Sequence, residues 1–349
     1  MFGNYFRYFF DKFKMTPNIT PTENGIPQIV VLDGGFSTQL CCHIGEIVDG
    51  DPLWSARFLA THPEEVINTH LDFLRAGADV IMTNTYQASI GGFVQYLNMT
   101  PEDSLELIKN AVNLAKTACD QFMEEYPDPD RSRPLIVGSV GPYGASLHDG
   151  SEYSGSYADQ VTKQQLREWH IPRIEALIES GVDLLGIETI PCGKEAEVLV
   201  ELIKEYPHIK AWLSFSCKDG AIANGDNFHK TVRKCYDSNP QQLVAVGINC
   251  LGPKYVEPLI KGLNKGRENR PIPIIVYPNS GENYNPESGW IDREKCEPVE
   301  GYIKHWLDLG VTWIGGCCRT YASDVSRIRN EVQKWSHEQK FNSDFKNNV

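Results

Sequence analysis

Near the end of the chain, a helical pattern passes into an apolar run through Leu307-Asp308-Leu309-Gly310-Val311-Thr312. Two earlier stretches show the same order of residue types, Leu74-Arg75-Ala76-Gly77-Ala78-Asp79 and Ile178-Glu179-Ser180-Gly181-Val182-Asp183. In each, a helix end is followed by a glycine, a small apolar residue, and Asp or Thr. Glycine readily adopts the left-handed backbone conformation that ends a helix and turns the chain. The shared stretch therefore predicts repeated helix-to-strand connections.

Eight short apolar runs are predicted as strands, with amphipathic stretches between them. The predicted strands are residues 29–32, 80–83, 135–140, 184–187, 211–216, 243–248, 274–277 and 311–314. The clearest helical patterns cover residues 63–76, 101–125, 163–180, 194–205, 255–265 and 299–309. Alternation of strand and helix is the plan of an α/β fold of the (β/α)8 TIM-barrel type. We expect one barrel domain over residues 26–337, with an N-terminal extension at 1–25 and a polar tail at 338–349, of which residues 341–349 are expected to be frayed.

The three shared stretches also predict which side chains meet. Seven residues after each glycine lie Asn84, Glu188 and Cys317. Eight residues after it lie Thr85, Thr189 and Cys318. These positions fall at the carboxyl ends of predicted strands, where a TIM barrel carries its active site.

Two adjacent cysteines follow the last predicted strand, in Gly315-Gly316-Cys317-Cys318-Arg319-Thr320. A disulfide between neighbouring residues is strained, whereas soft thiolates bind zinc well. A catalytic zinc keeps three protein ligands and leaves a fourth position for substrate. Cys250 is the candidate for the third sulfur, because it also ends an apolar run at 243–250. The alternative is that these are buried, inert cysteines.

The composition of the chain limits which binding partners and which cellular compartment are expected. The chain has 349 residues, of which 41% are hydrophobic and 23% charged, as in soluble globular proteins. Its net charge of -13 disfavours nucleic acid and anionic membranes and suits a cationic small molecule. Apolar runs are too short for a membrane span. Ten cysteines without a secretory signal are typical of a reducing compartment, so we expect a cytoplasmic protein.

Two connections are predicted to form walls or lids of a site. Residues 138–145 and 149–155 make a long loop, rich in glycine and tyrosine, after the third predicted strand. Residues 277–282 make the turn after the seventh. Long ordered loops in compact domains are commonly functional.

Three motifs carry a resemblance to a known family. They are Asp33-Gly34-Gly35, Gly247-Ile248-Asn249-Cys250 and Gly315-Gly316-Cys317-Cys318-Arg319-Thr320. With them, the chain resembles the homocysteine S-methyltransferase family over residues 29–334. The segments 51–56, 186–191 and 277–282 look most like the branch that uses S-methylmethionine, or less readily S-adenosylmethionine, as methyl donor. The resemblance implies methionine synthesis by methyl transfer to a zinc-bound homocysteine thiolate.

The resemblance also implies roles for single residues. Cys250, Cys317 and Cys318 would bind one zinc ion per chain. Glu188 would pair with the homocysteine ammonium, and the alternative for it is an ordinary surface carboxylate. The backbone amides around Asp33, Gly34 and Gly35 would hold the substrate carboxylate, and a plain turn is the alternative there. Aromatic faces attract onium groups. The candidates for the donor pocket, each of which could equally be a packing residue, are Trp54, Tyr86 and Tyr143.

Two other functions stay open at this stage. Betaine-homocysteine methyltransferases share the barrel and the chemistry but carry an additional C-terminal arm for oligomerisation. Little follows Trp335, which favours the sulfonium branch and a monomer. A non-catalytic zinc-binding or thiol-binding barrel is the alternative from a different class, although a closed structural zinc site normally has four protein ligands. We interpret Cys41 and Cys42 as packing residues, and Cys192 and Cys217 as weak candidates for the metal.

Overall fold

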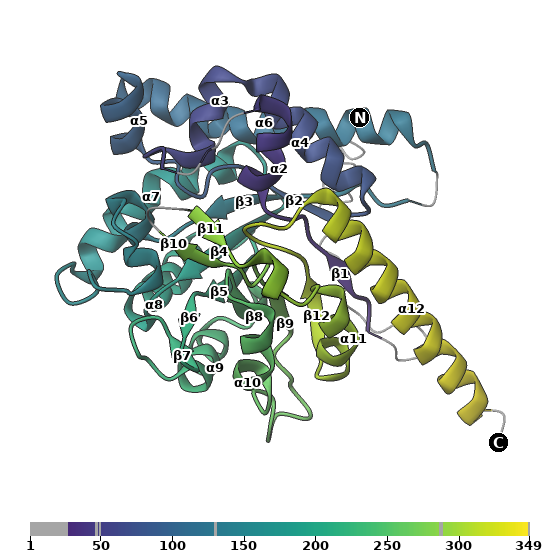
Figure 1. Cartoon of the computed structure of the whole chain (residues 1–349). Coiled ribbons are helices and arrows are strands. Elements are labelled where there is room, and N and C mark those ends of the chain that lie inside the picture. Colours follow the sequence, from purple (N-terminus) through teal and green to yellow (C-terminus); the bar gives the residue numbers. More distant parts are fainter. Residues whose placement is uncertain (1–26, 46–47, 49, 129–130, 286–288, 348–349) are drawn as a thin grey trace, which may run out of the picture.

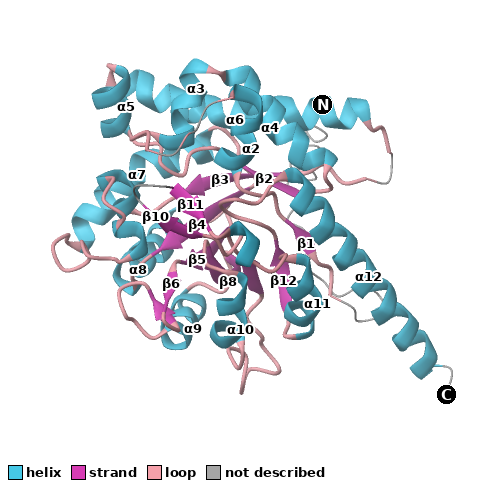
Figure 2. Cartoon of the chain, viewed as in Figure 1, coloured by secondary structure: helices cyan, strands magenta, loops and turns pink. Residues whose placement is uncertain are grey.

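The computed structural model describes residues 27–45, 48, 50–128, 131–285 and 289–347. The expected N-terminal extension at 1–25 lies outside the described residues. The architecture is a barrel of parallel strands surrounded by helices (Figure 1). In Figure 2 the strands, in magenta, occupy the centre of the molecule, and the helices, in cyan, lie around them.

All eight predicted strands are present, within three residues of the predicted ends. They form one sheet in the order β1-β12-β9-β8-β5-β4-β3-β2, and every pairing within it is parallel. Their bounds are β1 Val30–Val31, β2 Val80–Met82, β3 Leu135–Val140, β4 Leu184–Ile190, β5 Ala211–Phe215, β8 Leu243–Asn249, β9 Ile274–Tyr277 and β12 Val311–Ile314. The predicted TIM-type barrel is therefore confirmed.

One aspartate links the two ends of the sheet. β1 and β2 stand at opposite ends of the strand order, and Asp79 lies just before β2. Its backbone N–H donates to the Val31 carbonyl at 2.7 Å, and its carboxylate accepts the Val31 N–H at 2.8 Å. Backbone groups that would otherwise form a free sheet edge are thus paired, which closes the barrel.

The interior of the barrel is filled by large side chains. Trp212, Tyr277 and Trp313 are each fully buried, and they belong to an apolar cluster separate from the larger one between strands and helices. The Trp212 indole N–H donates to the Tyr277 hydroxyl at 3.1 Å. The interior is therefore a packed core rather than a pore, and the chemistry must lie at its mouth.

Helices cover the outside of the barrel. The α-helices are α2 Phe36–Ile44, α3 Phe58–Thr61, α4 Pro63–Arg75, α5 Ile90–Leu97, α6 Pro101–Glu125, α7 Lys163–Glu179, α8 Gly193–Leu202, α9 Phe228–Ser238, α10 Val256–Ile260, α11 Glu300–Asp308 and α12 Ala322–Asn347. Short 3-10 turns are η1 Trp54–Arg57, η2 Tyr143–Leu147, η3 Ser151–Tyr153, η4 Ile203–Glu205, η5 Pro253–Tyr255 and η6 Arg293–Lys295. Two small hairpins, β6 Cys217–Lys218 with β7 Ala221–Ile222 and β10 Asn283–Asn285 with β11 Gly289–Ile291, follow β5 and β9.

The helix ends agree with the local sequence signals. Gly77, Gly181 and Gly310 adopt φ values of 99°, 78° and 94°, as the shared stretch predicts. The helix predicted over 255–265 is shorter than expected, because α10 ends at Ile260 and Gly262 turns the chain with a φ of 77°. In the described part of the chain, none of the helices is both long and apolar enough to cross a membrane.

The C-terminal segment differs from the prediction of a frayed tail. α12 continues to Asn347, so residues 338–347 are helical. The helix packs against α11 (Figure 1). There the Trp335 indole N–H donates to the Asp308 carboxylate at 2.8 Å. The polar composition of residues 338–347 led to the wrong prediction of a tail without structure. A helix that is anchored by one buried face can continue beyond it on its own backbone hydrogen bonds.

Candidate metal centre

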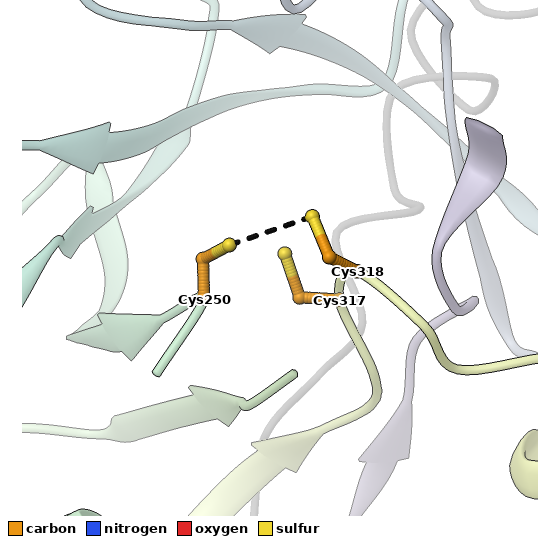
Figure 3. Close-up of side chains that lie close together, drawn as sticks. All are labelled: Cys250, Cys317 and Cys318. Atoms are coloured by element: carbon orange, nitrogen blue, oxygen red, sulfur yellow. Dashed lines mark hydrogen bonds between the residues drawn. The ribbon is translucent and has the colours of Figure 1, made fainter. Parts of the chain in front are cut away.

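Three cysteine sulfurs come together at the carboxyl ends of β8 and β12. The Sγ atoms of Cys250, Cys317 and Cys318 all lie within 4.8 Å of one another. Those of Cys250 and Cys318 are 3.6 Å apart (Figure 3). Hydrogen bonding to Cys317 and then Cys318 holds the pKa of Cys250 well below its usual range. We call this group the sulfur cup; its three soft donors suit a metal ion.

The end of β9 holds both walls of the sulfur cup in place. The Cys250 N–H donates to the Tyr277 carbonyl at 3.1 Å, and the Cys317 N–H donates to the Pro278 carbonyl at 2.8 Å. Cys250 itself has a φ of 55°, which is uncommon for a residue other than glycine. Such conformations persist where the surroundings impose them, and they gather at functional sites.

Two glycine pairs let the first and last strand ends interlock. A Cβ atom on Gly35 would lie 2.5 Å from the Cys317 carbonyl oxygen, and one on Gly316 would lie 2.2 Å from the Thr320 hydroxyl. The Gly35 N–H donates to the Thr320 carbonyl at 2.9 Å and to its hydroxyl at 3.0 Å. The Gly35 amide is therefore committed to the cysteine loop, which corrects its predicted role in holding the substrate carboxylate.

Glu188 lies at the end of β4 and is 6% exposed, so it is not the surface carboxylate of the alternative interpretation. Its carboxylate accepts a short hydrogen bond from the Ser139 hydroxyl. Burial raises the pKa of Glu188 to about 7, and the negative charge of Cys250 adds to the effect. Glu188 is therefore a buried acid beside the sulfur cup, and a cationic ligand would stabilise its ionised form.

Asp33 has one carboxylate oxygen in use and one without a partner. Oδ2 accepts the Met82 N–H at 2.8 Å, which ties the end of β1 to β2. Oδ1 is buried and has no hydrogen-bond partner. Burial raises the pKa of Asp33 well above its usual range, and the nearby Glu188 charge raises it further. Because buried polar atoms are nearly always paired, the free oxygen indicates a place for a ligand or a water.

Asn249 connects the strand ends beneath the sulfur cup. Its side-chain oxygen accepts the Thr189 N–H and the Ser214 hydroxyl, each at 2.9 Å, and its Nδ2 donates to the Thr189 hydroxyl at 2.7 Å. Asn249 precedes Cys250, and Thr189 follows Glu188. One amide thus sets the relative positions of a sulfur and a carboxylate.

The predicted aromatic residues lie in two places: Trp54 and Tyr86 form one pair, and Tyr143 packs elsewhere. Trp54 lies edge-on to Tyr86, with 5.8 Å between ring centroids, and the Tyr86 hydroxyl is buried without a partner. Tyr153, in η3, places its hydroxyl 3.3 Å from the Cys250 sulfur. Tyr143 packs into the long loop and α7, with its ring 5.4 Å from that of Trp169.

Sequence reasoning missed Tyr153, Ser139 and Asn249 as site residues. The signal for Tyr153 was its place in the long loop at 149–155, which was predicted to be a wall. Asn249 lies inside a quoted motif, but its function depends on partners from β4 and β5. Such cross-strand contacts have no signature in the local sequence.

A second carboxylate lies on the loop above the sulfur cup. Glu152 precedes Tyr153 in η3, and its Oε2 atom is buried without a partner. Burial raises the pKa of Glu152 to about 7, and the Cys250 charge raises it further. The Glu152 charge in turn raises the pKa of Tyr86. Glu152 therefore faces the same space as Cys250 and Tyr86.

The four other cysteines considered in the sequence analysis do not belong to the sulfur cup. Cys41 and Cys42 lie in α2. Cys41 packs against the core, as predicted, whereas Cys42 is exposed, which contradicts its predicted packing role. Cys192 caps α8, where burial raises its pKa to about 12, and Cys217 opens β6. Within the described residues, the candidate metal-binding group contains none of these four.

Comparison with known proteins settles the family. The sequence model of the homocysteine S-methyltransferase family matches residues 30–332. The chain belongs to this family. The family's enzymes are methyltransferases, and the resemblance carried by the three motifs is confirmed.

Among the relatives of this homocysteine S-methyltransferase family member, one is named for its methyl donor and others are named for the acceptor alone. A betaine-homocysteine S-methyltransferase of Drosophila melanogaster is 47% identical, over 87% of this chain and 94% of that protein. The homocysteine S-methyltransferase YbgG of Bacillus subtilis is 40% identical, over 86% of this chain and 93% of that protein. The metallated form of the homocysteine methyltransferase MmuM from Escherichia coli superposes with a TM-score of 0.75 at 35% identity, covering 87% of this chain and 96% of that one.

Proposed function

We propose that this family member is a zinc-dependent homocysteine S-methyltransferase that makes methionine with S-methylmethionine as donor. The observation that carries the proposal is the sulfur cup, in which Cys250, Cys317 and Cys318 converge from two strand ends. S-adenosylmethionine is the secondary donor. The bounds 26–337 for the domain, the monomeric state and the cytoplasmic location stay predictions.

The donor set supports zinc among the possible metals. Zinc favours cysteine sulfur, and catalytic zinc sites characteristically have three protein ligands. The sulfur cup supplies three soft donors of the kind that such a site uses. When bound, zinc lowers the pKa of a coordinating thiol, so that the nucleophilic thiolate predominates at neutral pH.

A carboxylate and two backbone amides around the sulfur cup would hold the ammonium and carboxylate groups of homocysteine. Glu188 would accept the substrate ammonium, since its carboxylate is buried and bound on one side by Ser139. The amides of Asp33 and Gly34 would hold the substrate carboxylate. The side chain of homocysteine would then extend toward the cysteine sulfurs, and its orientation would be restricted before reaction.

The transfer step needs alignment more than acid or base chemistry. The homocysteine thiol loses its proton to solvent, and its sulfur attacks the methyl carbon of the donor. A new carbon–sulfur bond forms while the old one breaks, and its electron pair stays on the donor sulfur. S-methylmethionine therefore leaves as methionine, and the homocysteine becomes a second methionine. Holding the sulfurs and the carbon in line accounts for the rate enhancement.

Aromatic rings next to the sulfur cup suit an onium donor. Trp54 and Tyr86 form an edge-on pair, and the Tyr153 hydroxyl touches the Cys250 sulfur. Ring faces attract cations by about 0.5–2 kcal/mol, depending on how far the cation is desolvated. We keep Trp54 and Tyr86 as donor-pocket residues and add Tyr153. Tyr143 stays a prediction as a more distant wall.

A second candidate donor is betaine, and the 47% identity to the Drosophila betaine-homocysteine S-methyltransferase favours it. The deciding experiment supplies zinc-loaded protein with homocysteine and one donor at a time: S-methylmethionine, S-adenosylmethionine or betaine. Methionine formed is the readout. We expect the highest kcat/KM with S-methylmethionine. A higher value with betaine would reject the proposed donor, and zinc and homocysteine binding without methionine from any donor would indicate a non-catalytic barrel.

A further inference from the structure

We propose that Glu152 binds the α-ammonium group of an amino-acid sulfonium donor and thereby selects S-methylmethionine over betaine. The inference rests on the proposed function and adds a specificity-determining residue to it. The residue is not one of those that the family motifs implied.

The backbone of Glu152 is held firmly at the mouth of the barrel. Its carbonyl accepts the Ser216 hydroxyl at 2.6 Å, which ties η3 to the end of β5. The next residue, Tyr153, contacts the Cys250 sulfur through its hydroxyl at 3.3 Å. Glu152 therefore lies on a loop that contacts both the sulfur cup and the end of β5.

The carboxylate of Glu152 has an unused hydrogen-bonding atom. Oε2 is buried and accepts no hydrogen bond from the described residues. The nearby Tyr86 hydroxyl is likewise buried without a partner. A buried carboxylate oxygen left unpaired is unfavourable, so a ligand with N–H donors is expected to fill this place. Glu188 already provides the carboxylate for the ammonium of homocysteine, which leaves Glu152 for the second substrate.

Charge considerations place the donor's ammonium, rather than its sulfonium, at Glu152. The positive charge of the sulfonium fades as the methyl group transfers, so a carboxylate against it would stabilise the ground state more than the transition state. The ammonium charge stays constant through the reaction. A carboxylate paired with it strengthens donor binding without slowing the transfer, and its loss should raise KM while kcat holds.

The same contact separates the two donor classes. S-methylmethionine carries an ammonium with three N–H donors, which can fill the free carboxylate oxygen. Betaine carries a quaternary nitrogen without any N–H. Binding betaine would leave Oε2 of Glu152 without a hydrogen bond, and unpaired buried polar groups are a strong source of discrimination between similar ligands.

The test compares two sulfonium donors on the full-length, zinc-loaded protein. One is S-methylmethionine, and the other is (3-carboxypropyl)dimethylsulfonium, which keeps the sulfonium and the carboxylate but lacks the ammonium. Steady-state methionine formation is measured for wild type, for Glu152→Gln and for the control Glu124→Gln, which changes an exposed residue of α6. Zinc content and the KM for homocysteine show whether each variant is intact.

For Glu152→Gln, we expect the KM for S-methylmethionine to rise about tenfold to a hundredfold with little change in kcat, as for loss of a charged hydrogen bond. The KM for the desamino donor should not change. Equal loss with both donors, or no loss with S-methylmethionine, would overturn the inference. If Glu152→Gln does not fold, the wild type decides alone: similar KM values for the two donors would also overturn it.

The proposed function is judged by a separate result of the same experiment. Turnover of S-methylmethionine by the wild type supports the donor assignment whatever Glu152→Gln does. A wild type that uses betaine but neither sulfonium would reject both the donor and the role of Glu152.

Discussion

The Glu282 carboxylate accepts two hydrogen bonds from the Arg319 guanidinium, at 3.1 and 3.3 Å, immediately after Cys318 in the chain. Glu282 is buried, and it also accepts the Ser280 hydroxyl at 2.6 Å. Through this contact Arg319 braces the cysteine loop. The pair joins the loop after β12 to the loop after β9, so that a sulfur of the cup is supported from outside.

Glu282→Gln should weaken metal binding. A neutral amide cannot balance the guanidinium, and outer partners of metal ligands typically contribute about tenfold or more to metal affinity. Chelator competition on the full-length protein would measure the zinc Kd. The matched control is Glu331→Gln, which breaks an exposed pair with Lys334. A Kd for Glu282→Gln equal to that of the control would contradict the bracing role.

Cys317→Ala should abolish both zinc retention and methionine formation, because two sulfurs do not make the three-ligand site that a catalytic zinc needs. Metal content after gel filtration and turnover with S-methylmethionine are the two measurements. Cys42→Ala, which changes an exposed cysteine in α2, should keep both. Full zinc stoichiometry in Cys317→Ala would rule out its assignment as a ligand.

Glu188→Gln should impair homocysteine binding and leave the metal in place. Loss of a charged hydrogen bond to the substrate ammonium predicts a rise of about tenfold or more in the KM for homocysteine. The KM for the donor should change little. Glu201→Gln, which alters an exposed ion pair with Lys204, is the control. An unchanged KM for homocysteine would exclude the proposed contact.

Gly35→Ala should disturb the sulfur cup from its far side. The added Cβ would lie 2.5 Å from the Cys317 carbonyl oxygen, too close for the two backbones to stay in place. We expect a loss of about 1–3 kcal/mol in the free energy of unfolding together with weaker zinc binding. Gly301→Ala, a helical position with open space around its Cβ, should be neutral or stabilising. Equal stability of the two variants would contradict the interlocked arrangement.

His70 should make the fold sensitive to acid. It is fully buried in α4, both ring nitrogens lack partners, and burial lowers its pKa to about 3. Between about pH 6.5 and pH 3 the unfolded chain binds a proton that the folded chain excludes, so stability falls with falling pH, by up to about 1.4 kcal/mol per unit. Urea unfolding of metal-free protein at several pH values would show a shallower acid loss for His70→Phe. Parallel curves for the two proteins would disprove this.

The barrel was predictable because its signals are local. The glycines at 77, 181 and 310 end helices with left-handed conformations, and strands of three to seven residues follow them. Two predictions of element bounds failed, one for a local reason and one because of a contact between helices. Gly262 ended a helix earlier than its periodicity indicated, and the polar segment beyond 337 remained helical behind an anchor at Trp335.

The site was predictable in part. Strand-end counting and the vicinal cysteines brought Cys250, Cys317, Cys318 and Glu188 to one level, since the carboxyl ends of parallel strands in a barrel share one face. The sequence did not predict which single polar atoms of the site are free to bind a ligand and which are already hydrogen-bonded. The Gly35 amide is used by Thr320, whereas one oxygen of Asp33 is left over.

Residue order alone was enough for the chain's α/β barrel, its family and the three sulfurs, because periodicity, glycine turns and short motifs act over a few residues. The folded molecule was needed to show Tyr153 against Cys250, 97 residues away, and the unpaired oxygens of Glu152 and Asp33. The physical reason is that hydrogen-bond satisfaction depends on which loops meet, and loops from distant strands meet only when the barrel closes.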